Sequence, residues 1–269
     1  MVDARDLKSL GALPCAGSIP ALGTFFFNEL EIAHVCDQAL GFFAFITTLR
    51  GVYQMDLLKG IKSRRSVRVF HKKVPSKKVI QECLESATWA PNPTNQQPWE
   101  FIVVTGERLK GISEIIVETF PQRMREMDPY HGIPKACEER KNETFEQLFT
   151  AAKRAGIDSK NLFQKNLTFY GAPVAIFFIT YKAAHTLYRH STVAALQNFL
   201  LAAHAKGLGT CWLSSVAACQ DEIKAFLELS GEKEIVDGVA LGYPVKDSPF
   251  NTIARKRVPV KEVIRWMGF

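Results

Sequence analysis

The sequence predicts an α+β fold in which a mixed central sheet is flanked by helices. Helix-like and strand-like patterns alternate irregularly along the chain, and no internal repeat or low-complexity tract accompanies them. Of the 269 residues, 47% are apolar, which is enough to bury a sizeable core. Nothing from residue 55 onward resembles a linker. We therefore expect one globular domain over residues 55–269, preceded by an N-terminal extension of unknown role over residues 1–54.

The extension carries little interpretable pattern. Residues 10–24 are rich in Gly, Ala and Pro, and the apolar run 39–49 has about 11 residues against the roughly 20 that span a membrane. The run also lies too far from Met1 for a signal peptide. We expect no membrane association. The extension is either an accessory arm that packs on the body or a partner subunit, or a stretch that function does not need.

Two helices are expected at the start of the domain. Residues 56–65 predict the first, because Asp56 suits a helix N-terminus and apolar residues follow on one face. The second begins with Ser76 as its N-cap and ends before Pro91. The first helix would deliver Arg64 and the residues after it at its C-terminal end.

The middle of the chain predicts a buried strand over residues 101–105 and an amphipathic helix over 109–120. The polar stretch 121–165 follows, helical in parts, with Pro121, Pro129 and Pro134 as breaks. We expect this stretch to run over the surface, where it could cover a pocket.

The second half predicts a strongly apolar strand over residues 174–180 and a central buried helix over 192–206, which is apolar almost all round. Gly207 and Gly209 are expected to end that helix. A helix over 221–229, a strand over 235–241 and a last short helix over 260–267 complete the domain.

Charge and cysteine content narrow the function. The chain has 34 Lys and Arg against 27 Asp and Glu, a net charge of +7, which suits an anionic ligand. No nucleic-acid-binding signature accompanies these charges, so we expect no nucleic-acid partner. The six cysteines show no C-x-x-C pair and no zinc spacing, which indicates reduced thiols in a cytoplasmic protein. Cys211 is expected to be a packing residue, because no activating group lies near it in sequence.

Two segments carry the chemistry. Arg64, Arg65, Ser66 and Arg68 crowd guanidinium groups and a hydroxyl into one short stretch, as a phosphate clamp would require. About 25 residues later, the stretch 90–99 places carboxamides between prolines, and such side chains can read the edge of a planar ring. Taken alone, a three-arginine turn is more often a solvated helix end.

Several familiar sites are absent from the sequence. It contains no G-x-G-x-x-G fingerprint, no Walker loop, no G-x-S-x-G elbow and no H-E-x-x-H. If the protein performs redox chemistry, a bound cofactor must therefore be its reactive centre, and the protein supplies position and electrostatics.

From about Met55 to the C-terminus, the chain resembles the FMN-dependent nitroreductases. The resemblance rests on a set of motifs in the family's order, of which any one could occur by chance. They are Ser63-Arg64-Arg65-Ser66-Val67-Arg68-Val69-Phe70, Thr94-Asn95-Gln96-Gln97-Pro98-Trp99-Glu100-Phe101, Tyr170-Gly171-Ala172-Pro173-Val174, Gln197-Asn198, Gly207-Leu208-Gly209-Thr210-Cys211-Trp212, Val239-Ala240-Leu241-Gly242-Tyr243-Pro244 and Arg255-Lys256-Arg257-Val258-Pro259.

The resemblance implies an FMN enzyme that uses NAD(P)H to reduce nitroaromatics, quinones or related electron-poor small molecules by a ping-pong mechanism. It also implies a homodimer with the flavin at the subunit interface. No protein side chain is expected to be catalytic, because the flavin carries the chemistry, and no metal is expected. The residues expected to bind the cofactor are Arg64, Arg65, Ser66, Arg68, Asn95, Gln97, Leu213, Ser214, Ser215, Arg255 and Arg257.

Some positions depart from the family. Ser191 stands where the relatives' long helix often has Asp, and the turn after Cys211 reads Trp-Leu-Ser-Ser where relatives often have Gly or Glu. Because that turn borders the flavin, the departures leave the substrate open. Trp99 and Trp212 are expected in the core. A specialised flavin reaction such as reductive dehalogenation, or a flavin-binding protein without turnover, remains an alternative.

Overall fold

A four-stranded sheet lies at the centre of the part of the chain that the computed structural model describes, residues 55–183 and 186–269. Its order is β1-β2-β4-β3, and each pairing is antiparallel. The strands are β1 (Trp99–Thr105), β2 (Val174–Tyr181), β3 (Gly209–Leu213) and β4 (Lys233–Gly242). The expected domain boundary and the role of the extension concern residues 1–54, outside the described residues, and stay predictions.

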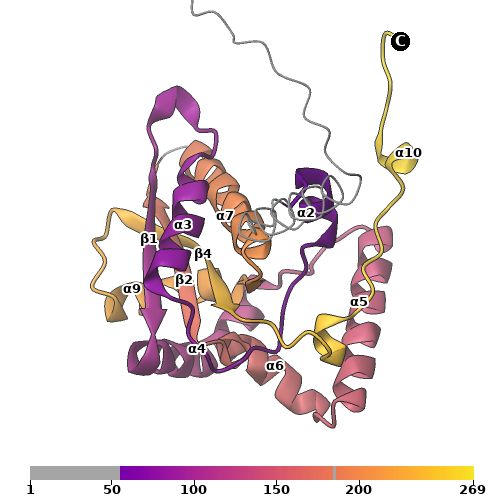
Figure 1. The fold of residues 1–269 in the computed structure, drawn as a ribbon, viewed down its shortest axis with the longest axis horizontal. Helices are drawn as coiled ribbons and strands as arrows, with labels where there is room; N and C mark the ends of the chain where they lie inside the picture. The colour runs from indigo at the N-terminus through magenta and orange to yellow at the C-terminus, as the bar shows by residue number, and fades with distance from the viewer. Residues whose placement is uncertain (1–54, 184–185) are drawn as a thin grey trace, which may run out of the picture. The chain divides into compact units, whose positions relative to one another are not determined.

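Helices cover both faces of this sheet, which confirms the α+β prediction (Figure 1). A parallel component is limited to one bridge among the described residues, Ser66 with Thr210. The α-helices are α2 (Leu57–Ser63), α3 (Lys77–Thr88), α4 (Gly106–Met127), α5 (Lys135–Arg154), α6 (Ser159–Leu167), α7 (Leu187–Ala205), α8 (Ser215–Ala218), α9 (Gln220–Phe226) and α10 (Val260–Val263). Short 3-10 helices are η1 (Pro93–Asn95), η2 (Phe169–Gly171) and η3 (Pro249–Asn251).

The hydrophobic core lies in two layers, one on each side of β2. Successive strand residues face opposite sides of a sheet. The even-numbered residues from Val174 to Phe178 pack with α3 and α7, and the odd-numbered residues from Ala175 to Ile179 pack with α4, α8 and α9. Because both faces are covered, β2 is apolar without interruption, as the sequence predicted. The buried face of α7 confirms the expected central helix.

The caps of the first two helices are those expected from the sequence. Asp56 accepts a hydrogen bond from the backbone N–H of Lys59 at 2.8 Å, and Ser76 accepts one from Val79 at 3.4 Å. The expected end of the first helix was wrong, because α2 stops at Ser63 and Arg64 already has extended dihedral angles. Residues 64–70, called the arginine segment below, are therefore extended chain that can lie beside a strand.

The expected helix break at Pro121 was also wrong. Helix α4 continues through Pro121 to Met127 and ends where Asp128 adopts a left-handed conformation. A proline inside a helix costs about 3 kcal/mol, since it removes a hydrogen bond and crowds the preceding turn. The buried residues Ile112 and Ile116 hold the helix against the sheet, and we attribute its continuation to this packing. The breaks at Pro129 and Pro134 are confirmed.

Other differences concern the sheet edge and the tail. Strand β1 is longer than expected and mostly half-buried. The last helix ends at Val263 rather than residue 267. Strand β3 was not expected, because Gly207 and Gly209 were both assigned to the end of the preceding helix. Gly207 does follow α7 with a φ of +73°, whereas Gly209 is the first residue of β3.

Gly209 allows a close approach between two segments. A Cβ atom at this position would lie 2.8 Å from Cγ1 of Val67, closer than side chains pack. Val67 belongs to the arginine segment, and its N–H donates to the carbonyl of Thr210 at 2.8 Å. The missing side chain therefore lets the arginine segment lie against β3.

We predict that Gly209→Ala lowers the free energy of unfolding by about 1–3 kcal/mol, because the added methyl group overpacks this contact. Urea unfolding measures the change. Gly231→Ala is the matched control, since nothing lies within 4 Å of a Cβ atom there. Equal stability of the two variants would contradict the close-contact interpretation.

Candidate functional site

The arginine segment runs beside the edge strand β3. Ser66 forms a parallel bridge with Thr210, and Phe70 bridges Pro244 beyond the end of β4. Val67 is buried between them, 5% exposed. Because neighbouring residues of an extended segment point to opposite sides, Ser66 and Arg68 share the side opposite Val67.

Asn251, which was not expected to be a site residue, ties the arginine segment to the C-terminal tail. Its side-chain oxygen accepts hydrogen bonds from the N–H groups of Arg68 at 2.7 Å and Val69 at 3.2 Å. Its side-chain nitrogen donates to the carbonyls of Val69 and Val245, each at 2.8 Å. Asn251 is 4% exposed, so these four bonds satisfy a buried amide completely.

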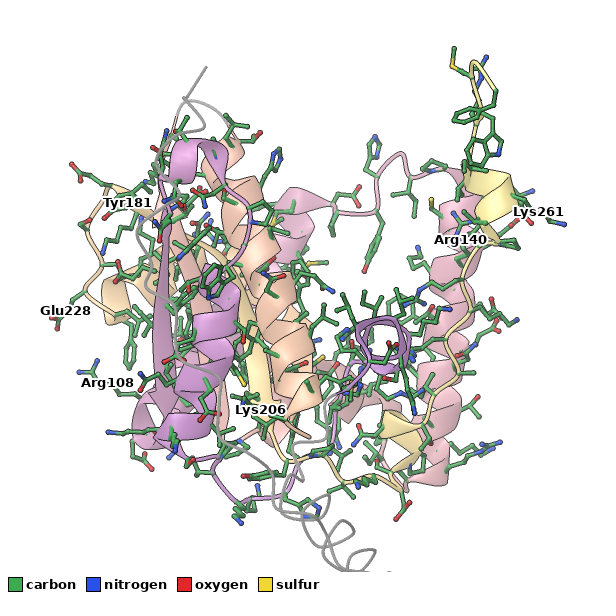
Figure 2. All side chains as sticks on the ribbon, turned by 45° about the horizontal axis from the view of Figure 1, so that its top comes forward. Arg108, Arg140, Tyr181, Lys206, Glu228 and Lys261 are labelled. Atoms are coloured by element: carbon green, nitrogen blue, oxygen red, sulfur yellow. The ribbon has the colours of Figure 1, made fainter. Side chains whose placement is uncertain are left out.

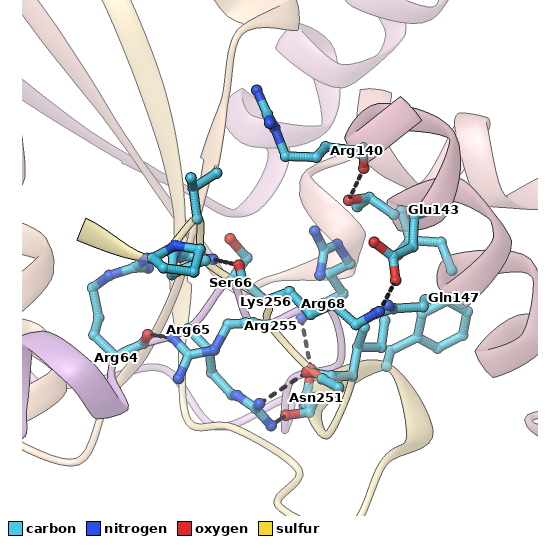
Figure 3. A pocket seen from close by; sticks show the side chains of 18 of the residues that line it. Arg64, Arg65, Ser66, Arg68, Arg140, Glu143, Gln147, Asn251, Arg255 and Lys256 are labelled. Atoms are coloured by element: carbon cyan, nitrogen blue, oxygen red, sulfur yellow. Dashed lines mark hydrogen bonds and ion pairs between the residues drawn. The ribbon is translucent and has the colours of Figure 1, made fainter. Parts of the chain in front are cut away.

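A cavity of about 440 Å³ opens where these segments meet (Figure 3). Six residues predicted to bind the cofactor lie on its wall together with residues of α5 and the tail. The lining residues that matter below are Arg64, Arg65, Ser66, Arg68, Arg140, Glu143, Asn251, Arg255, Lys256 and Arg257. The structure therefore brings the first motif and the basic tail together, as the phosphate clamp requires, and adds Arg140 from α5.

Two of these arginines are committed to the backbone. Arg65 donates to the carbonyls of Asn251 and, at 2.9 Å, of Ile253. Arg255 donates to the carbonyls of Arg64, Lys62 at 2.8 Å and Ser63 at 3.3 Å. Both side chains therefore fasten the tail to the arginine segment.

Arg64 and Arg68 have the character of ligand-binding groups. Burial lowers the pKa of Arg64, and the positive charge of Arg257 acts in the same direction. The Nε atom of Arg68 is buried and has no hydrogen-bond partner among the described residues, while its guanidinium lies 6.0 Å from the centroid of the Tyr170 ring. A desolvated cation and an unpaired buried donor both favour an anionic acceptor in the cavity.

The remaining charges around the cavity are largely positive. Lys256 pairs with Glu143. Burial lowers the pKa of His204, and the charges of Arg64 and Arg255 lower it further, so the histidine is held neutral beside them. His204 forms a 2.8 Å hydrogen bond with Ser63. The arrangement suits a dianionic phosphate such as that of FMN, which can accept from several guanidinium groups at once.

The structure does not place Asn95 and Gln97 on this cavity. Their loop contacts the start of α7, where the Tyr188 hydroxyl donates to the Gln96 side chain at 2.5 Å. Ser63, directly before the arginine segment, contacts His204 at the end of α7. Tyr188 and His204 are about 16 residues apart, which is roughly 24 Å along a helix. Within one chain, the loop that carries Asn95 and Gln97 is therefore far from the arginine segment, and the two predicted halves of the cofactor site do not meet.

The loop itself is conformationally strained. Thr94, Asn95 and Gln97 have φ angles of +49°, +56° and +49°, in the left-handed region that residues other than glycine rarely adopt. Asn92 helps hold this geometry, because its side-chain oxygen accepts from the N–H of Gln97 at 2.8 Å. Strain of this kind gathers at ligand sites, and the exposed side chains of Asn95 and Gln97 are available for a ligand or a partner.

The third predicted group lies at the end of β3. Leu213 is the last residue of that strand and is 1% exposed, while Ser214 is exposed and precedes α8. The Ser215 hydroxyl is buried without a hydrogen-bond partner among the described residues. None of the three lines the arginine cavity.

Two side chains near this turn were not expected there. Trp212, predicted to be in the core, is 36% exposed. Asp237 of β4 has a buried Oδ1 atom without a partner among the described residues, and burial raises its pKa to about 6 against the effects of a Trp212 hydrogen bond and the charge of Arg189. The sequence held a signal for Asp237, since a carboxylate interrupts the apolar run 235–241. No such signal marks Arg140 or Asn251.

Cys211 is buried, and burial raises the pKa of its thiol, so the structure agrees with a packing role. Among residues 55–183 and 186–269, no group of three or more His, Cys, Asp or Glu could hold a metal ion. Within the same ranges, no helix has the length and apolar character needed to cross a membrane.

Comparison with known proteins identifies the family. The Nitroreductase family matches residues 61–243, and the chain belongs to it. It is 31% identical over 221 residues to a 4-nitrobenzoate reductase of Pseudomonas putida, covering 78% of this chain and 94% of that protein. It is 26% identical over 200 residues to an iodotyrosine deiodinase of Thermotoga neapolitana, covering 74% and 94%.

A solved structure supports the same assignment. The FMN and NADPH-dependent nitroreductase NfnB from Sphigopyxis sp. strain HMH superimposes with a TM-score of 0.70 at 25% identity, covering 80% of this chain and 100% of that one. The fold is therefore the one expected from the sequence.

We predict that Asn251→Ala lowers the free energy of unfolding by about 2–4 kcal/mol, because it leaves buried backbone groups without partners. Thermal unfolding measures the loss. Asn161→Ala on α6, whose side chain is exposed, is the control. A stability equal to that of the control would show that Asn251 does not hold the arginine segment to the tail.

Proposed function

We propose that this protein is an FMN-dependent oxidoreductase that uses NAD(P)H to reduce nitroaromatics, quinones or related electron-poor small molecules. The observation that carries the proposal is the arginine cavity, in which Arg64 is desolvated and Arg68 has an unpaired buried donor among the described residues. Membership of the nitroreductase family supports it, as do the relatives named for nitrobenzoate reduction and for FMN and NADPH dependence.

The phosphate of FMN would be held by Arg64, Ser66, Arg68 and Arg257. Arg65 and Arg255 act less directly, because their guanidinium groups donate to backbone carbonyls and so fix the wall of the cavity. A phosphate between guanidinium groups gains charge-assisted hydrogen bonds of about 1.5–3 kcal/mol each.

The flavin ring would lie toward the end of β3. From the bridge between Ser66 and Thr210, the strand leads to Leu213, Ser214 and Ser215, whose backbone donors would face the ring. Asn95 and Gln97 would reach the ring from a second copy of the chain, since the arginine cavity of their own chain lies roughly 24 Å away along α7. The proposed unit is therefore a homodimer, and the exposed apolar side chains of α2 agree with such packing.

When bound, FMN supplies the redox chemistry, accepting a hydride from NAD(P)H and passing two electrons to the oxidant. The chain contributes charge and position. The guanidinium groups would hold the phosphate end, the Leu213–Ser215 turn would border the ring, and the carboxamides of a second subunit's loop would contact its edge. The sequence has no second nucleotide-binding motif, so nicotinamide and oxidant would use one face in turn, in a ping-pong mechanism.

Two alternatives share this cofactor site. A specialised flavin reaction such as reductive dehalogenation is favoured by the similarity to the iodotyrosine deiodinase. A flavin-binding protein without turnover would keep the arginine cavity but would not oxidise NAD(P)H.

We also propose a cytoplasmic location, supported by four free cysteines among the described residues.

We predict that Arg64→Ala, Arg68→Ala and Arg257→Ala each weaken FMN binding by roughly one to two decades, the equivalent of one charge-assisted contact. Titration of the flavin-free protein with FMN measures the affinity. Arg108→Ala is the control, because Arg108 is exposed on α4, well away from Arg140 of the cavity (Figure 2). Unchanged affinity in all three cavity variants would refute the phosphate clamp.

We predict parallel lines in double-reciprocal plots when NAD(P)H is varied at several oxidant concentrations, because the two substrates occupy one site in turn. Asn95→Ala should slow flavin reduction far more than it lowers stability, since the side chain is exposed and alanine loses only about 1 kcal/mol at the positive φ of this position. Intersecting lines, or undiminished flavin reduction in the Asn95 variant, would contradict the shared-site mechanism.

A further inference from the structure

Asp237 occupies an unusual place in the sheet. It lies in β4, where Gly238 pairs with Leu213, the last residue of β3, so Asp237 stands one position beyond that strand and level with the turn that follows. On its other side it pairs with Phe178 of β2. A carboxylate here interrupts a core strand at the point nearest the turn.

The side chain faces α7. A Cβ atom on Gly238 would meet Val216 of α8 at 2.5 Å, so Gly238 faces α8. Because strand residues alternate, Asp237 faces the opposite side with Phe178 and Val239, in the layer that packs on α7. Trp212 pairs with Val239 and therefore belongs to the same face.

Two side chains act on the Asp237 carboxylate. The Trp212 indole is a diagonal neighbour of Asp237 on the adjacent strand and lowers its pKa, and the charge of Arg189 on α7 acts in the same direction from the facing helix. Arg189 itself donates to Glu234 at 3.3 Å. The Oδ1 atom remains buried without a partner among the described residues. A carboxylate with a buried, unused oxygen is costly, and such groups gather at functional sites.

Trp212 is the partner that links Asp237 to the proposed site. The other β3 residues are buried, whereas Trp212 is 36% exposed. It directly precedes Leu213, where the turn proposed to line the flavin begins. An accessible indole in this position offers a flat face on which a planar aromatic molecule can stack.

We propose that Asp237 is a positioning residue that holds the Trp212 indole as a stacking platform for planar aromatic oxidants. The inference rests on the proposed function, since it places that oxidant beside the turn at the end of β3. Asp237 acts through Trp212 and does not touch the oxidant.

The protonation state of Asp237 sets the strength of this hold. Burial raises its pKa to about 6, so the carboxylate is charged above that pH and neutral below it. In this proposal the indole N–H donates to Asp237, and such a bond is charge-assisted with the carboxylate and weaker with the neutral acid. Trp212 is therefore held most firmly above pH 6 and released as the pH falls through 6. The other charged groups on this side, Arg189 and Glu234, are retained in a variant of Asp237, which separates their effect from that of the carboxylate.

Intrinsic fluorescence tests the coupling without any catalytic readout. The wild type should show a titration step near pH 6 that is absent from both Asp237→Asn and Trp212→Phe. A carboxamide has the shape of the neutral acid, so the D237N protein is expected to fold. A titration step that persists in either variant would overturn the link between the two side chains. This outcome does not depend on whether the protein has the proposed enzymatic activity.

Steady-state kinetics tests the role in substrate binding. Nitrobenzene is the probe, because it is planar and does not titrate, and ferricyanide is the control oxidant that does not stack. The KM for nitrobenzene should rise about fivefold between pH 8 and pH 5 in the wild type and stay at the higher value in D237N at every pH. The KM for ferricyanide should not distinguish the two proteins. Equal KM values for nitrobenzene in the wild type and D237N at pH 8 would overturn the proposal. A loss of kcat for both oxidants in D237N would do the same.

Discussion

The four hydrogen bonds of the buried Asn251 amide are the interaction on which the candidate site depends. They join the arginine segment to the residues that follow β4, two parts of the chain that are more than 180 residues apart. Without this amide, the N–H groups of Arg68 and Val69 would lose the oxygen to which they donate. The tail that carries Arg255 and Arg257 would then be attached to that segment through the side chains of Arg65 and Arg255.

The positively charged side chains that line the cavity differ in how they are stabilised. Arg65 and Arg255 donate to carbonyl oxygens, and Lys256 has Glu143, so part of the positive charge is stabilised within the chain. Arg64 is instead desolvated, and Arg68 keeps a buried donor that is unpaired within the described part of the chain. An anion that fills the cavity would remove both costs, which is a physical reason for the site to prefer a phosphorylated ligand.

Local patterns predicted much of the fold, and long-range packing accounts for the rest. The caps at Asp56 and Ser76 and the buried strand β2 depend on neighbouring residues, so the sequence predicted them. The passage of α4 through Pro121 depends on packing against the sheet, which no local pattern records. Strand β3 was missed because its first residue, Gly209, has the appearance of a helix end but is needed for contact with Val67.

The candidate site was predicted only in part, again because long-range contacts leave no local pattern in the sequence. The arginines of the first motif and of the tail meet in one cavity as the resemblance implied. Asn95 and Gln97 do not reach it, because α7 separates their loop from the arginine segment, and we propose that they act from a second subunit. Asn251 and Arg140 come from a turn and a helix whose sequences carry no sign of the contacts they make.

We propose above all that the arginine cavity binds the phosphate of FMN. The most direct measurement compares the affinity of the flavin-free protein for FMN with its affinity for riboflavin, which has the same ring and ribityl chain but no phosphate. The account predicts that FMN binds at least 100-fold more tightly, about 2.7 kcal/mol, and that the difference shrinks in Arg68→Ala. Equal affinities for the two flavins would contradict it.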